Sequence, residues 1–88
     1  MSIKPGVIVM WDSQASGVFK IKRGKVLGIV NPEEDAYEYV PPELRTKHSR
    51  VKGQRFSSIK RVAVEVPREN GRGCDYYFPR FSIIKKVL

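Results

Sequence analysis

The stretch RVAVEVPRENGRGCDYYFP, Arg61–Pro79, has a valine at every second position of VAVEV, then an Asn-Gly pair, then a run of aromatic residues. The three valines of VAVEV fall on one face of an extended chain, because successive side chains of a strand point to opposite faces. The Asn-Gly pair at 70–71 indicates a hairpin turn, since both residue types tolerate positive φ. The aromatic run that follows predicts the returning strand. This stretch therefore predicts a β-hairpin.

Two further strands are predicted upstream. Val7 to Trp11 is a run of β-branched and bulky residues directly after a Pro-Gly turn signal. Ser13–Gly17 is predicted as a loop of small polar residues. In Phe19–Lys22, apolar and basic side chains alternate as in a half-exposed strand. The Arg-Gly pair at 23–24 then predicts a break.

Another strand, Lys25–Val30, contains Gly28, which indicates a bulge or a tight bend. Near the end of the chain, PRFS at 79–82 predicts one tight helical turn and IIKKVL at 83–88 a last strand. Five or six short strands without a long helix predict an all-β chain. Strands at this spacing favour a small, closed or nearly closed barrel, because closure removes exposed sheet edges.

Residues 31–58 form the least regular part of the sequence. Pro41-Pro42 excludes one continuous helix, and PPELRTKH can open a helical turn. We interpret 31–58 as a long, partly mobile insert, since loops of this length in compact domains are often functional. The whole chain, residues 1–88, is long enough for one small domain only.

The order of these elements resembles that of Src-homology-3-like small barrels, including the KOW and Tudor groups. Within it, RGKVLGIV, Arg23–Val30, is similar to the basic-Gly-x-Val core of KOW segments. The resemblance implies a five- to six-stranded barrel that carries the charged insert as an additional loop.

The chain also resembles a group of small uncharacterised proteins from bacteriophages and mobile elements. That group has an aromatic residue before an SQAxG loop, a short middle segment and a late YYxPRxS element. The resemblance implies a phage or mobile-element origin, and hence a bacterial host cytoplasm, but no particular activity. The matching positions are Trp11, Ser13, Gln14, Ala15, Gly17, Tyr76, Tyr77, Pro79, Arg80 and Ser82.

Charge is the strongest functional signal. The chain has 17 Lys or Arg against 9 Asp or Glu, a net charge of +8, which attracts polyanions such as nucleic acid. The charges are also separated along the chain. The run TKHSRVKGQRFSSIKR, residues 46–61, has six Lys or Arg and no acid, whereas NPEEDAYEYVPPE, residues 31–43, has five carboxylates and no Lys or Arg.

We therefore predict that the protein binds DNA or RNA by phosphate contacts, with a second basic cluster on the strand at 19–25 and one tyrosine that can stack on a base. Other interpretations stay open. The basic run can be a solvated loop or can fold onto the acidic segment. Lysines on the strand can serve only to prevent pairing with another strand edge. The aromatic residues can belong to the core. The candidate residues are Lys47, Arg50, Lys52, Arg55, Lys60, Arg61, Lys20, Lys22, Arg23, Lys25 and Tyr77.

A protein–protein interaction module is the alternative function, for example a phage-encoded modulator or inhibitor of a host or defence complex. Small barrels hold partners in aromatic grooves or along strand edges. A structural subunit of a particle is a third class, which self-association would reveal, and the oligomeric state stays open. In the alternative, acidic residues dock a basic partner: Glu33, Glu34, Asp35 and Glu38.

No catalytic triad, phosphate-cradling loop or paired-acid motif is visible, so we expect no enzyme and no cofactor. The single His48 and single Cys74 do not supply a metal site of ordinary ligand number. One cysteine excludes an intramolecular disulfide and suits a reducing compartment. The N-terminal apolar run is too short for a signal peptide or a membrane span, which favours a cytoplasmic location.

Overall fold

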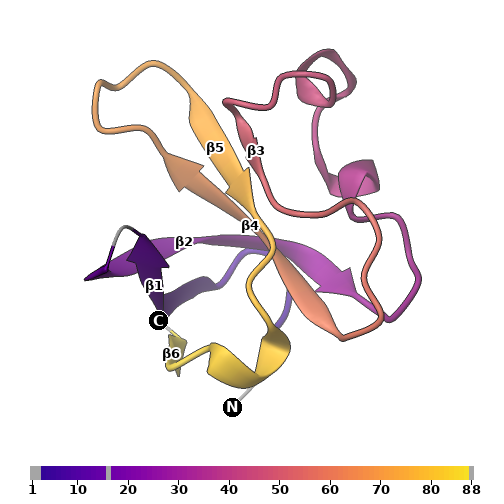
Figure 1. Ribbon diagram of the computed structural model, residues 1–88, viewed down its shortest axis with the longest axis horizontal. Coiled ribbons are helices and arrows are strands. Elements are labelled where there is room, and N and C mark those ends of the chain that lie inside the picture. Colours follow the sequence, from indigo (N-terminus) through magenta and orange to yellow (C-terminus); the bar gives the residue numbers. More distant parts are fainter. Residues whose placement is uncertain (1–2, 16, 88) are drawn as a thin grey trace.

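The computed structural model describes residues 3–15 and 17–87. Within these residues, six strands form one mixed sheet in the order β3-β5-β4-β2-β1-β6, and the helical elements are three 3-10 turns (Figure 1). β3 is parallel to β5, and the other neighbours are antiparallel. The prediction of an all-β chain is confirmed. The elements are β1 (Ile8–Ala15), β2 (Val18–Val30), η1 (Ala36–Tyr39), η2 (Pro42–Leu44), β3 (Val51–Lys52), β4 (Arg61–Pro67), β5 (Cys74–Tyr77), η3 (Phe81–Ile83) and β6 (Lys86–Val87).

The sheet folds back on itself along β2. The first half of β2 pairs with β1, where Trp11 lies opposite Lys22, and the second half pairs with β4. In a flat sheet, a residue of β1 would lie three strand spacings, about 14 Å, from one of β5. The ring centroids of Trp11 on β1 and Tyr77 on β5 are 5.9 Å apart. The β1–β2 hairpin is therefore folded over the β4–β5 hairpin.

Gly24 marks the place where the two layers touch. A Cβ on Gly24 would lie 2.5 Å from the backbone oxygen of Glu65 and 2.6 Å from the Val64 side chain. Only glycine allows two backbones to approach so closely. The predicted break at 23–24 was wrong, because the missing side chain permits this layer contact and β2 continues through it as one strand.

Two hydrophobic clusters lie on opposite faces of β4, which confirms the alternation predicted for VAVEV. We call the cluster between the folded layers the first core and the cluster on the other face the second core. The first core contains Val9, Trp11, Val26, Val62, Val64 and Ile84. The second core contains Val30, Ala36, Val40, Val51, Ala63, Tyr76 and Phe78.

The insert supplies the cover of the second core. Ala36 and Val40 are each 1% exposed, and η1 and η2 lie beside the edge strand β3 (Figure 1). The backbone N–H of Ala36 donates to the carbonyl of Arg55 at 2.8 Å, which ties the two arms of the insert together. The helical turn predicted in PPELRTKH is confirmed as η2. The segment predicted as a partly mobile loop is packed, because it contributes apolar side chains to a core.

Other local predictions have mixed outcomes. The hairpin at the Asn-Gly pair is confirmed, and Gly71 and Gly73 in its turn have φ of +73° and +87°. The predicted tight turn near the end of the chain is η3. By contrast, β1 continues to Ala15 through residues predicted as a loop, because the first half of β2 runs opposite them. The predicted last strand is the short β6, and Leu88 lies outside the described residues.

The described sheet has two ends, β3 and β6, so the strand pairs do not include the closure predicted for a barrel. The fold is an open, strongly bent sheet with a core on each face. Over residues 3–15 and 17–87, no helix has the length and apolar character that crossing a membrane requires.

Gly28 provides a test of how the insert is anchored. It lies at a register shift between β2 and β4, which confirms the predicted bulge. A Cβ there would overlap the ring of Tyr39, whose hydroxyl donates to the Ile29 carbonyl at 3.1 Å. We expect Gly28→Ala to lower the free energy of unfolding by about 2 kcal/mol, because the added methyl group overpacks a filled site. Urea denaturation measures this difference. In a Tyr39→Ala background the same change should cost much less. Equal costs in both backgrounds would contradict this account.

Candidate nucleic-acid interface

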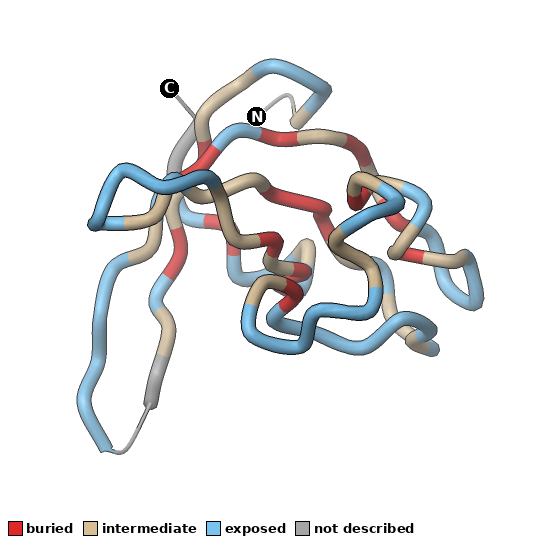
Figure 2. The backbone as a smooth tube through the Cα atoms, turned by 90° about the horizontal axis from the view of Figure 1, so that it is seen from above, coloured by how far each residue is buried: buried red, intermediate tan, exposed pale blue. Residues whose placement is uncertain are grey.

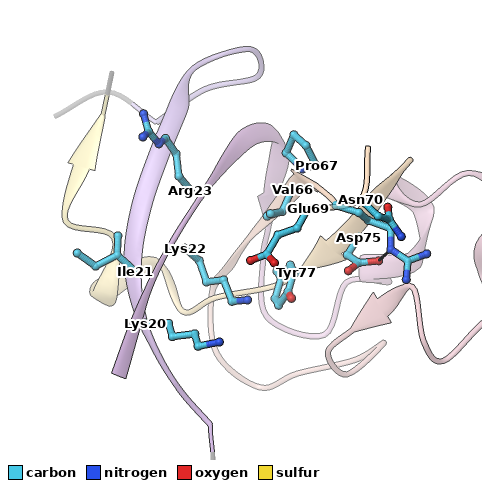
Figure 3. Close-up of a pocket in the computed structure, with 11 residues that line it drawn as sticks. Lys20, Ile21, Lys22, Arg23, Val66, Pro67, Glu69, Asn70, Asp75 and Tyr77 are labelled. Carbon is cyan, nitrogen blue, oxygen red and sulfur yellow. Dashed lines mark ion pairs between the residues drawn. The ribbon is translucent and has the colours of Figure 1, made fainter. Parts of the chain in front are cut away.

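A groove of about 520 Å³ opens between the β1–β2 hairpin and the β4–β5 hairpin (Figure 3). It lies beyond the contact of Trp11 with Tyr77, where apolar side chains between the layers give way to charged ones. We call it the hairpin groove. It is lined by Lys20, Ile21, Lys22, Arg23, Val66, Pro67, Arg68, Glu69, Asn70, Asp75 and Tyr77.

Two lysines face this groove because of the register of the β1–β2 hairpin. Directly opposite residues of an antiparallel pair share a face. Lys22 lies opposite Trp11, which is buried in the first core, and Lys20 lies opposite Ser13. The Lys22 Nζ lies 5.1 Å from the centroid of the Tyr77 ring, within the range of a cation–π contact. In Figure 3 both lysines point toward the β5 wall of the groove.

The apolar residues of the same strand point the other way. Phe19 is 72% exposed and Ile21 is 67% exposed, and Ile21 points away from Tyr77 in Figure 3. The predicted alternation along 19–22 is confirmed. The lysines, and not the apolar residues, share the side of the strand that faces the first core. Local alternation does not reveal this, because the side is set by pairing with β1.

The opposite wall carries Arg68 and Asp75. Asp75 Oδ1 lies 3.4 Å from the Arg50 Nε and 3.7 Å from the Arg68 Nε. Arg50 also donates to the Cys74 carbonyl from Nε at 3.1 Å and from a terminal nitrogen at 2.7 Å, which fixes it behind the wall. The groove lining has four Lys or Arg and two Asp or Glu. Positive charge is therefore in excess in the groove, and one of its two carboxylates is already offset.

Arg55 of the basic run is held by the acidic segment. It donates two hydrogen bonds to the carboxylate oxygens of Asp35, at 2.9 and 2.8 Å, and Asp35 also accepts the Tyr37 N–H at 3.0 Å. The hydrogen bonds from Arg55 hold the pKa of Asp35 below its ordinary value. The alternative in which the basic run folds onto the acidic segment is confirmed for this pair.

Two more arginines of the run have internal partners. Arg61 donates to the Ser57 hydroxyl and to the Phe78 carbonyl, both at 2.9 Å, and Arg50 is fixed against Cys74 and Asp75 as described above. Three of the six cations predicted to contact phosphate from the basic run are therefore engaged internally: Arg50 and Arg61 join the insert to the sheet, and Arg55 joins the two arms of the insert. They contribute to the field of the protein, but several of their donors are already hydrogen-bonded within it.

The lysines of the basic run are exposed: Lys47, Lys52 and Lys60. The Lys60 Nζ lies 4.1 Å from the centroid of the Phe81 ring. In the second basic cluster, Lys25 pairs with Glu65 at 3.8 Å. Among the eleven candidate residues, Lys20, Lys22, Arg23 and Tyr77 line the hairpin groove. Lys20 and Lys22 point into it, whereas the Arg23 side chain points away from Tyr77 at its rim (Figure 3).

Sequence reasoning missed Arg68 as a groove residue. The available signal was its position directly after the strand-ending Pro67, at the turn end of the predicted hairpin. It also did not anticipate the exposure of Phe19 and Ile21, because alternating apolar residues are expected to face a core.

The acidic residues proposed to dock a basic partner serve several roles. Asp35 holds Arg55, and Glu34 accepts the Asn31 N–H at 2.8 Å. Glu33 has a φ of 69°, and Glu33 and Glu38 are exposed.

Titratable groups elsewhere have structural surroundings. Burial raises the pKa of the half-buried Cys74 thiol, which lowers its thiolate fraction at neutral pH. Burial and the nearby Glu65 raise the pKa of Tyr76 to about 12, and its hydroxyl donates to Glu65 at 3.3 Å. In the described ranges, no group of three or more His, Cys, Asp or Glu is placed to hold a metal ion.

Comparisons of the chain with protein-family models, with curated proteins and with solved structures found no significant match.

Asp35 gives a test of the insert. We expect Asp35→Ala to lower the melting temperature by several degrees, because loss of a capping carboxylate costs on the order of 1 kcal/mol. Since the pKa of Asp35 is lowered in the fold, its contribution is present above the ordinary value of 3.8 and is lost as the pH falls through the folded value. The difference between wild type and variant should therefore hold at pH 7 and shrink well below pH 4. Glu43→Ala, an exposed position in η2, is the control. Equal melting temperatures for Asp35→Ala and wild type at pH 7 would contradict the assigned role.

Proposed function

We propose that the protein binds nucleic acid through the phosphate backbone, at the hairpin groove, without base-specific readout and without catalysis. The carrying observation is the placement of Lys22 over the ring of Tyr77, in a concave site with more cations than carboxylates. A basic groove with an aromatic side chain suits a sugar–phosphate strand, since cations meet the phosphates and the aromatic ring meets a sugar or base face.

The groove is a stronger candidate than the basic run of the insert. Lysines on a flexible stem with their three donors free are suited to phosphate contact as point charges. Lys20 and Lys22 meet this description, whereas Arg50, Arg55 and Arg61 have their guanidinium donors engaged internally. The remaining lysines of the run and Arg23 and Lys25 then add to the attracting field, together with Arg68 on the other wall.

We also propose that the bent sheet is an open form of the Src-homology-3-like small barrel. In support, β2 serves two layers, with Gly24 where the layers touch and a bulge at Gly28, as tightly curved small sheets require. The bacteriophage or mobile-element origin and a bacterial cytoplasmic location stay predictions from the sequence resemblance.

A protein–protein interaction module is the second candidate. The observation that favours it is the exposure of Phe19 and Ile21 at 72% and 67%, because large exposed apolar side chains often mark contact sites. In this role the acidic surface of Glu33, Glu34 and Glu38 would hold a basic partner. Replacing these three acids by glutamine would then abolish partner capture and leave nucleic-acid binding intact.

Salt dependence tests the proposed function. We expect affinity for random-sequence nucleic acid, measured by fluorescence anisotropy, to fall steeply with salt. The logarithm of the affinity should change with that of the salt concentration by about −0.9 for each duplex phosphate contacted. Lys20→Ala with Lys22→Ala should weaken binding by roughly tenfold and reduce the slope by about two.

Lys47→Ala with Lys52→Ala is the matched comparison, because it removes the same charge from the insert. It should weaken binding less than the groove variant does. Flat binding from low to moderate salt would contradict the proposal, and equal losses in the two variants would contradict the assignment to the groove.

A further inference from the structure

The distal part of the β1–β2 hairpin projects from the rest of the protein as an arm (Figure 2). We define the arm as residues 11–15 and 17–23. Beyond the paired Trp11 and Lys22, the register continues for four residue pairs, to Ala15 opposite Val18. At about 3.3 Å per residue, this gives a reach of roughly 13 Å. Val18, Phe19 and Ile21 on the arm are exposed by 54%, 72% and 67%.

Cations lie on both faces of this ribbon. Lys20 and Lys22 share the groove face with Trp11. Arg23, like Phe19 and Ile21, lies on the outer face, and Lys25 continues this row at the base of the arm, because every second residue of a strand points the same way. A flat anionic surface or one nucleic-acid strand would meet only one of these faces. A pair of phosphate backbones on either side of a groove meets both.

We infer that the arm enters the major groove of B-form duplex DNA. Lys20 and Lys22 contact the backbone on one side, which passes through the hairpin groove, and Arg23 and Lys25 contact the backbone on the other side. This depends on the proposed function, since it names the kind of nucleic acid that the same site binds, and it departs from it in one respect, because the apolar end of the arm adds contacts with base edges to the contacts with phosphates.

The dimensions favour this groove over the others. The side chains on the two faces of a β-ribbon span roughly 10 Å, the distance at which sheets pack face to face. The major groove of B-form DNA is about 12 Å wide and about 8.5 Å deep and admits a two-stranded ribbon, whereas its minor groove is only about 6 Å wide. The major groove of duplex RNA is too narrow for side chains to read. The reach of the arm exceeds the depth of the DNA major groove.

The DNA major groove also has an apolar surface that the exposed side chains of the arm can contact. Thymine presents its C5-methyl group on the floor of the major groove, and apolar side chains contact it. Phe19 and Ile21 lie at the projecting end of the arm, where they meet base edges, and the cations at 22, 23 and 25 lie closer to its base, where they meet phosphates. Apart from Lys20, which lies between Phe19 and Ile21 and reaches the backbone through its long side chain, this order along the arm matches the order of methyl and phosphate groups from the floor to the rim of the groove.

The test measures anisotropy of labelled 20-base-pair duplexes of one AT-rich sequence at fixed salt, with DNA, RNA and single-stranded DNA as ligands. A further DNA duplex has uracil in place of every thymine, which removes the C5-methyl groups from the major groove. We expect DNA duplex binding to be about tenfold tighter than binding of RNA duplex or single strand, and the uracil duplex to lose several-fold.

Phe19→Ser with Ile21→Ser should lower affinity for thymine-containing duplex by about tenfold and abolish the difference between thymine and uracil. Phe56→Ser is the matched control, because Phe56 is 54% exposed but lies on the insert; it should change neither. Both variants replace exposed side chains, so we expect both to fold. The uracil comparison uses the wild-type chain and is independent of any effect of a variant on folding.

Equal binding of all four ligands, or preference for single strands or RNA, overturns the inference and leaves the proposed function standing. No binding to any ligand overturns both. Vesicles of phosphatidylcholine and phosphatidylserine, and sedimentation of the protein alone, complete the test. Vesicle binding or self-association that is lost in Phe19→Ser with Ile21→Ser, without any change in DNA binding, assigns the arm to a membrane or to a second copy and overturns the inference.

Discussion

The fold-back of the sheet, held where Trp11 meets Tyr77 and where Gly24 meets the backbone of β4, constrains everything else in the structure. It lets a chain of 88 residues build a core between two hairpins without any long helix. Because the layers touch at Gly24 and diverge beyond Trp11, the first core ends there. Of the next residues outward on the inner face of β2, Lys22 is half-buried against the Tyr77 ring and Lys20 is exposed. They line a groove because the hydrophobic core between the two layers ends at Trp11 and Tyr77.

Arginines and lysines have different roles in this protein: the arginines of the basic run make internal hydrogen bonds, and its lysines are exposed. Arg50, Arg55 and Arg61 are each held by carbonyl, hydroxyl or carboxylate oxygens, a geometry that suits the planar fork of donors. An ammonium group is more strongly hydrated, and the lysines of the groove and the insert extend toward solvent. Most of the basic run's arginine content therefore serves to hold the insert over the second core. This is why the sequence of the run overstates its capacity to contact a partner, while the net charge that steers a polyanion toward the protein is unaffected.

Much of the fold was predictable from periodicity and turn chemistry. The alternation in β4, the hairpin at the Asn-Gly pair and the bulge at Gly28 each depend on local rules that hold in the structure. The continuity of β2 through Gly24 and the orientation of Phe19 were not predictable in this way, since both depend on contacts between segments far apart in sequence. The same is true of the site. The types of residue were identified, but the register with β1 decides that Lys22 faces Tyr77, and the fold-back brings Arg68 to the other wall.

The arm combines open strand edges with exposed apolar side chains, and each of these features favours aggregation. Over its distal residues the pairing of β1 with β2 leaves two strand edges beside exposed apolar side chains, a combination that favours association between chains. The cations on both faces oppose this, because two arms that approach each other bring like charges together at low dielectric. A second copy is thus repelled by the same groups that attract a polyanion. In the proposed complex, binding of a polyanion would remove that repulsion and at the same time cover the apolar surface of Phe19 and Ile21. On this proposal, the charge pattern disfavours association between two arms and favours an anionic partner that can cover them.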